Sequence, residues 1–111
     1  MEELKIEILP GADPSIRILK LSGPFTLRTI FEFQEVVRSN QTATTIIDLT
    51  GVPYMDSAAL GAILGFHASC HREGRNYTLV GVSERIQTLF KVAGVDGLLR
   101  LHTAAAEAAE A

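Results

Sequence analysis

The sequence has few of the features that mark specialised protein classes. Among its 111 residues there is a single cysteine, Cys70, so no disulfide can form within the chain, which favours a reducing compartment. The net charge is −3 and the lysines and arginines are scattered, so the basic patch of a nucleic-acid-binding protein is missing. We therefore expect neither a disulfide scaffold nor direct contact with DNA or RNA.

Long apolar segments and phosphate-binding loops are missing as well. The longest apolar run covers 58–66, far short of the roughly 20 residues that a membrane-spanning helix needs. The acidic start, Met1-Glu2-Glu3, is unlike a secretory signal, and no glycine-rich nucleotide loop occurs. With 47% hydrophobic residues, the chain is expected to form one cytoplasmic domain over 1–111, with no cofactor and no membrane contact.

What is present is a regular alternation of strand and helix patterns. Strands that alternate with helices require crossover connections. We therefore predict an α/β fold with a mixed, mostly parallel sheet of about five strands, three to four helices and an opening antiparallel hairpin. The tail, rich in alanine and glutamate, is expected to be helical or frayed. The predicted ranges are 4–8, 16–21, 44–49, 77–82 and 98–102 for strands, 26–39, 57–73 and 84–93 for helices, and 103–111 for the tail.

The first predicted helix carries an apolar stripe that fixes which aromatic side chains should be buried. Its helical spacing runs through Leu27, Ile30, Phe31, Gln34 and Val37, with Thr26 as a candidate cap. On this phase Phe31 belongs to the core. Two other phenylalanines nearby are Phe25 and Phe33. Either they pack under the tail or they form a surface for a partner or a dimer, and packing is the favoured interpretation.

The stretch from Asp48 to Gly61 is the most informative part of the chain. It predicts a buried strand, a short turn and a serine, Ser57, in the first turn of an apolar helix. Unpaired N–H groups and the helix dipole make that position tolerant of negative charge. Ser57 and the preceding Asp56 are therefore either a plain helix cap, worth about 1 kcal/mol, or a site that carries a phosphate.

Two neighbours of the serine favour a site over a plain cap. Tyr54 and Met55 precede Ser57 in a loop that is expected to be exposed, and a turn requires neither of them. Aromatic and methionine side chains are enriched in protein interfaces. Their position predicts contact with a protein partner.

A metal site is the weaker interpretation of another cluster. His67, Cys70 and His71 have the spacing that places two or three ligands on one helix face. No fourth ligand with suitable spacing accompanies them. Packed or half-exposed polar side chains are therefore the favoured interpretation, and no metal is expected.

A serine hydrolase is equally unsupported by the pattern around Ser57. The Gly-x-Ser-x-Gly turn of such enzymes is missing, because Met55 and Ala59 occupy the glycine positions. The sequence places no histidine beside the serine. We therefore expect a binding protein and not an enzyme.

Four motifs spread along the chain match the pattern of one family. They are Asp48-Leu49, Met55-Asp56-Ser57 followed by Leu60-Gly61, the strand and cap at 79–83, and Val92-Ala-Gly-Val-Asp96. In these motifs the chain resembles the STAS domain and, more narrowly, the anti-sigma-factor antagonists of bacteria. The resemblance extends from the opening hairpin to the last predicted strand.

This resemblance implies a binding switch that is controlled by phosphorylation. The unmodified antagonist binds an anti-sigma factor, often itself a serine kinase, and so frees a sigma factor. Phosphorylation of the serine that matches Ser57 breaks the complex, and a separate phosphatase restores it. Asp56 would support the phosphosite, and the protein would be a monomer or weak dimer. Four residues would contact the partner: Tyr54, Met55, Ala58 and Ala59.

A second function stays open on the same resemblance. A STAS domain can also serve as a scaffold or sensor subunit of a larger signalling or lipid-transport assembly, without phosphorylation. Two departures from the family pattern bear on this choice. Ala59 stands where the family often has glycine, and Thr26 stands where it often has an aspartate near the serine.

Overall fold

The computed structural model describes residues 3–39 and 41–99, which contain one four-stranded sheet. The strands are β1 (Lys5–Pro10), β2 (Ile16–Ser22), β3 (Thr44–Gly51) and β4 (Asn76–Val80), hydrogen-bonded in that order. β1 pairs antiparallel with β2, while β2, β3 and β4 are parallel. The predicted α/β class and the opening hairpin are confirmed.

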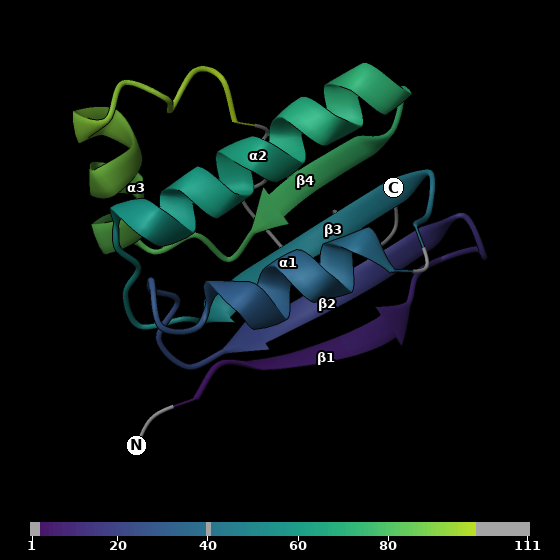
Figure 1. The fold of residues 1–111 in the computed structure, drawn as a ribbon, viewed down its shortest axis with the longest axis horizontal. Coiled ribbons are helices and arrows are strands. Elements are labelled where there is room, and N and C mark those ends of the chain that lie inside the picture. Colours follow the sequence, from purple (N-terminus) through teal and green to yellow (C-terminus); the bar gives the residue numbers. More distant parts are fainter. Residues whose placement is uncertain (1–2, 40, 100–111) are drawn as a thin grey trace.

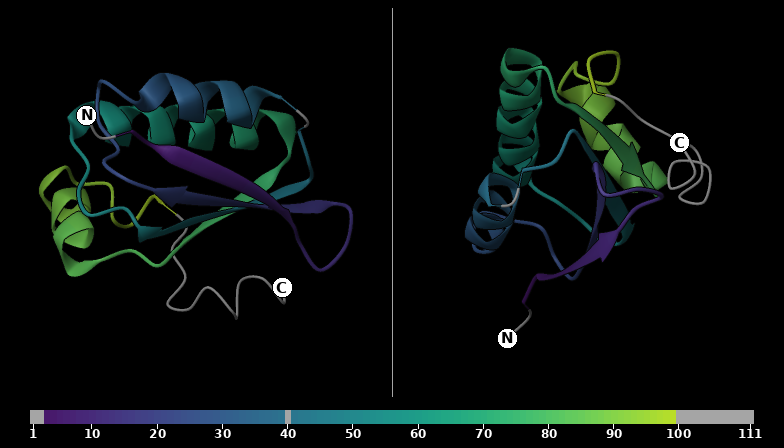
Figure 2. Two further views of the ribbon diagram at one scale, coloured as in Figure 1. Left: turned by 90° about the horizontal axis from the view of Figure 1, so that it is seen from below. Right: turned by 90° about the vertical axis from the view of Figure 1, so that its right-hand side faces the viewer.

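Two helices cover one face of this sheet, as Figure 1 shows. They are α1 (Ile30–Arg38) and α2 (Ser57–Glu73), which lie side by side. The third helix, α3 (Glu84–Val92), follows β4 and lies at the end of the sheet (Figure 2). Since β2, β3 and β4 run in the same direction, α1 and α2 begin at the edge where these strands end. Ser57 therefore lies at the carboxyl edge of the parallel sheet.

Local signals set the limits of α2 and α3 where the sequence predicts them. Asp56 caps α2, and Gly74 ends it in the left-handed region with φ of 69°, which glycine adopts without strain. Ser83 caps α3 by accepting a hydrogen bond from the backbone N–H of Ile86. In the part of the chain that the structure describes, no helix combines the length and apolar character needed to cross a membrane.

The prediction for the first helix is wrong in its start and in the burial of Phe31. α1 begins at Ile30 and not at 26, because a turn precedes it in which the N–H of Thr29 donates to the carbonyl of Thr26. The side chains that face the core are Phe33 and Val37. Within the predicted stripe, Val37 is buried, Ile30 packs against the core and Gln34 is half-buried. Phe33, however, takes the buried place that was predicted for Phe31.

The favoured interpretation of Phe25 and Phe33 as packed side chains is confirmed, whereas the prediction that Phe31 belongs to the core is wrong. Phe25 and Phe33 are 0% exposed and their ring centroids lie 5.1 Å apart, whereas Phe31 is 68% exposed. Phe25 is held in the core because its backbone forms a parallel bridge with Met55. The core therefore includes the two aromatic side chains outside the predicted stripe and leaves the one inside it in solvent.

A fifth strand is not found in the described residues. Leu98 and Leu99 lie in a turn and bend that follows α3, where the sequence predicts the start of a strand. The rest of that predicted strand, 100–102, and the tail 103–111 lie outside the described residues. The sheet that the structure describes thus has four strands and not about five.

A buried arginine connects the sheet to the end of α1. Arg17 on β2 is 5% exposed and sits on the same side of its strand as Leu19 and Leu21. Its guanidinium donates to Thr45 Oγ1 at 3.1 Å and to three backbone carbonyl oxygens at 2.8–3.2 Å. The three carbonyl groups belong to Val36, Val37 and Ser39. They lie at the C-terminal end of α1, where the helix dipole is negative.

Candidate functional site

Ser57 is the first residue of α2 and its side chain is exposed. Among the described residues, its hydroxyl has no hydrogen-bond partner, and the backbone N–H groups of Ser57 and Ala58 have no acceptor. These N–H groups lie at the positive end of the 17-residue helix α2. The hydroxyl is thus open to solvent in a place that favours an added anion.

Asp56 holds this helix start in place through both of its carboxylate oxygens. Oδ1 accepts from the N–H of Ala59 at 3.0 Å and caps α2, while Oδ2 accepts from the N–H of Leu27 at 3.0 Å. Its own N–H donates to the carbonyl of Phe25 at 3.3 Å. Asp56 therefore orients the turn and joins it to the loop before α1, but among the described residues no bond from it to the Ser57 hydroxyl is found.

Replacement of Asp56 by alanine should lower the free energy of unfolding by about 2 kcal/mol. About 1 kcal/mol reflects the lost cap, and a similar amount reflects the N–H of Leu27, which loses its acceptor. Urea unfolding followed by circular dichroism measures the change.

Ser83→Ala is the matched control, because Ser83 caps α3 with one side-chain bond only. It should cost about 1 kcal/mol. Equal losses for the two variants would show that the bond from Leu27 to Asp56 contributes nothing.

The expectation that Met55 is exposed is wrong. Met55 is 9% exposed and belongs to the main core, where its backbone pairs with that of Phe25. Ala59 is 0% exposed, because it lies on the side of α2 that faces the core. Neither side chain is available to a docked protein, so both are corrected from partner contacts to core residues.

The surface that remains around Ser57 is partly aromatic. Tyr54 is 39% exposed, with the guanidinium carbon of Arg85 at 5.8 Å from its ring centroid, and Ala58 is half-buried. Leu27 and Phe31 are 63% and 68% exposed, and Leu27 adjoins Asp56 through the hydrogen bond described above. Leu27 lies in the turn before α1 and Phe31 in the first turn of α1, and the sequence pattern placed both in the predicted apolar stripe and so gave no signal of this exposed pair.

The residues considered for a metal site have other surroundings. His67 Nδ1 lies 2.7 Å from the hydroxyl of Tyr77, Cys70 is buried and His71 is exposed. Over 3–39 and 41–99, no three His, Cys, Asp or Glu side chains are grouped so that they could hold a metal ion.

Comparison with known proteins identifies the family. The family model described as STAS domain matches residues 7–108. The chain belongs to the STAS domain family. The anti-sigma-B factor antagonist of Staphylococcus epidermidis is 32% identical to this STAS domain over 87 residues, which are 76% of this chain and 81% of the relative.

Solved structures share the fold of this STAS domain at lower sequence identity. An anti-sigma factor antagonist from Mycobacterium paratuberculosis superimposes with a TM-score of 0.83 at 13% identity, covering 98% of this chain and 96% of the other. The Bacillus cell fate determinant SpoIIAA in its phosphorylated form gives a TM-score of 0.73 at 15% identity, covering 96% of this chain and 97% of the other. At these identities the comparison establishes the fold alone.

Proposed function

We propose that this STAS domain is an anti-sigma-factor antagonist whose binding is switched off by phosphorylation of Ser57. The unmodified protein binds an anti-sigma factor of the serine kinase type, that kinase phosphorylates Ser57, and a phosphatase reverses the modification. One observation carries the proposal: the exposed Ser57 hydroxyl lies at the start of α2 in a chain 32% identical to an anti-sigma-B factor antagonist.

The start of α2 can accept a phosphate without unfolding the domain. Phosphoserine adds about −1.5 to −2 charges at pH 7, and the unpaired N–H groups of Ser57 and Ala58, with the helix dipole, offset part of that charge. Both carboxylate oxygens of Asp56 already accept hydrogen bonds from backbone N–H groups. The phosphate would therefore point outward, toward a docked partner.

Phosphorylation in vitro tests the proposal directly. The protein is incubated with ATP and the serine-kinase-type anti-sigma factor of the same organism, and its intact mass is measured. We expect a gain of one phosphate that is absent in Ser57→Ala. No gain, together with partner binding that survives Ser57→Asp, would refute the switch and point to the scaffold or sensor subunit.

The exposed aromatic side chain of Phe31, in the first turn of α1, should contribute to partner binding. Phe31→Ala removes a large apolar side chain that is 68% exposed in the free protein. The substitution should therefore change the stability of the domain little. We expect affinity for the anti-sigma factor to fall by about tenfold or more, as for a truncated interface aromatic. Isothermal titration calorimetry measures the change.

Val92→Ala is the control, because Val92 at the end of α3 is 82% exposed and should leave the affinity unchanged. The free energies of unfolding of both variants should equal that of the parent protein within about 0.5 kcal/mol. Equal affinities of the Phe31→Ala and parent proteins would remove α1 from the interface.

A further inference from the structure

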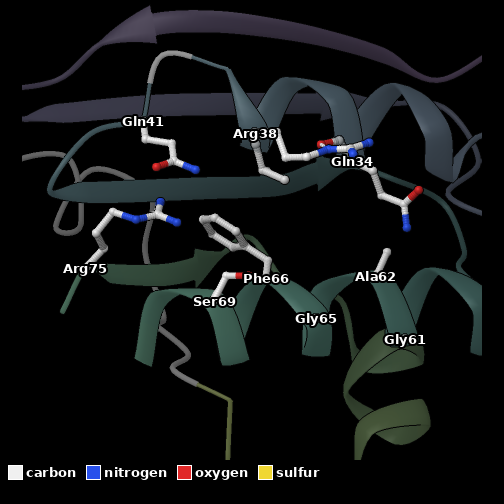
Figure 3. Close-up of a pocket in the computed structure, with 10 residues that line it drawn as sticks. Gln34, Arg38, Gln41, Gly61, Ala62, Gly65, Phe66, Ser69 and Arg75 are labelled. Atoms are coloured by element: carbon white, nitrogen blue, oxygen red, sulfur yellow. Dashed lines mark hydrogen bonds between the residues drawn. The ribbon is translucent and has the colours of Figure 1, made fainter. Parts of the chain in front are cut away.

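A groove separate from Ser57 runs between α1 and α2, and Figure 3 shows the residues that line it. Its volume is about 280 Å³, and its apolar floor is formed by Val37, Ala62 and Phe66. Two glycines of α2, Gly61 and Gly65, form part of its wall, and a Cβ added to either would meet no atom within 4 Å. The groove is therefore open because two consecutive turns of α2 lack side chains there.

The polar side chains of the groove carry an excess of positive charge. Arg38 and Arg75 line it together with Gln34, Gln41 and Ser69, and none of the lining residues is acidic. Figure 3 places the guanidinium of Arg75 and the amide of Gln41 near each other, with the ring of Phe66 beside them. The guanidinium carbon of Arg75 is 5.8 Å from the centroid of that ring.

Arg75 is only partly neutralised. Its side chain is 11% exposed, and Oε1 of Glu73 accepts from both Nε and Nη2, at 2.9 and 2.6 Å. The remaining nitrogen, Nη1, is buried and has no hydrogen-bond partner among the described residues. A buried guanidinium N–H without an acceptor is costly, so an acceptor that reaches it has a free energy gain available.

A second buried cation adds to the positive field at this end of the groove. The pKa of Arg17 lies below its usual value, first because burial disfavours the charged form and second because the charge of Arg75 is near. Of the two arginines that line the groove, Arg75 pairs with Glu73, whereas Arg38 has no ion pair among the described residues, so the wall keeps one positive charge without a paired carboxylate.

We infer that this groove binds a small organic monocarboxylate with a short apolar chain. The carboxylate accepts hydrogen bonds from Nη1 of Arg75, and the exposed side chain of Gln41 moves to admit it. The apolar chain lies over Phe66 toward Gly65 and Gly61. One uncompensated charge matches a monoanion, and the apolar floor matches a chain that inorganic phosphate lacks.

Hexanoate is the probe, with hexanamide as the neutral isostere and inorganic phosphate as the anion without an apolar chain. Titration of the ¹⁵N-labelled full chain should move the amide signals of Gly61 and Gly65 to saturation with hexanoate. Hexanamide and inorganic phosphate should each bind at least about tenfold more weakly, because one lacks the charge and the other the apolar contact.

Two variants separate binding in the groove from a general effect on the fold. Gly65→Leu fills the groove, and its Cβ meets no neighbour, so the domain should fold and lose hexanoate binding. Gly97→Leu is the matched control, since a Cβ at 97 also meets no atom within 4 Å and Gly97 is outside the groove. Arg75→Gln should lower the affinity for hexanoate by about tenfold and leave the affinity for hexanamide unchanged.

Equal binding of hexanoate and hexanamide would overturn the inference. So would hexanoate binding that survives Gly65→Leu, or phosphate that binds more tightly than hexanoate. None of these results depends on Ser57, so the groove and the phosphorylation switch stand or fall separately.

Discussion

Arg17→Leu should lower the free energy of unfolding by about 3–4 kcal/mol, the largest stability effect that we expect from one substitution in this protein. The leucine removes the donors to Thr45 and to three carbonyl groups at the end of α1. Each buried acceptor that is left without a donor costs about 1–3 kcal/mol, less where water or a neighbour replaces part of the loss. A domain of this size has only about 5–15 kcal/mol in total.

The stability lost in Arg17→Leu differs from the loss that follows when both partners of a buried ion pair are replaced. A buried ion pair can often be exchanged for apolar residues when both partners are replaced. Here three partners of Arg17 are backbone carbonyl groups, which no side-chain substitution can remove. The lost interaction with the negative end of α1 adds to the cost, so α1 should loosen from β2.

Urea unfolding of three variants checks this prediction. Lys20→Leu removes a charge from an exposed position of the same strand and should change the free energy by less than about 0.5 kcal/mol. Arg17→Lys should give an intermediate loss, because an ammonium keeps the charge but lacks the planar array of donors. An Arg17→Leu protein within about 1 kcal/mol of the parent would contradict the account of Arg17 as a cap of α1.

Ser57→Asp should weaken binding of the anti-sigma factor by about 100-fold if Ser57 is the switch that we propose. A new unit charge about 6 Å from a partner carboxylate costs roughly 2–3 kcal/mol at an effective dielectric constant near 20, and each 1.4 kcal/mol or so is a factor of about ten. Phosphoserine, with its larger charge, should weaken binding further. A micromolar complex would then no longer form.

The same substitution should leave the stability of the domain unchanged or slightly raised. Aspartate in the first turn of a helix interacts favourably with the dipole, by about 0.3–1 kcal/mol. Circular dichroism and urea unfolding of Ser57→Asp therefore distinguish a lost interface from a lost fold. A variant that lost binding only because it unfolded would contradict the proposed mechanism.

Ser83→Asp is the control for charge alone. Ser83 caps α3, aspartate is as good a cap as serine, and the added charge is the same. Affinity capture from native extract, with the retained proteins identified by mass spectrometry, compares the variants. We expect the parent protein, Ser57→Ala and Ser83→Asp to retain the anti-sigma factor and Ser57→Asp to lose it. An equal loss of anti-sigma-factor binding in Ser83→Asp would mean that the added charge, and not its place at Ser57, weakens the complex.

The sequence by itself determined the order of strands and helices, the limits of α2, and the place of Ser57 at the start of that helix. These features follow from neighbours in the chain: Asp56 reaches an N–H three residues on, and Gly74 adopts a left-handed conformation. Such local preferences act before any distant contact forms, so a single sequence carries them.

Only the tertiary structure decided which side chains face inward around that site. Phe25 and Met55 are far apart in the chain, and their pairing withdraws Met55 from the surface. Arg17 is buried because the end of α1 presents carbonyl groups to β2. The start of α1 at Ile30 depends on how the chain before it packs against the turn at Asp56. Each of these outcomes is set by contacts between distant segments, which periodicity within one segment does not encode.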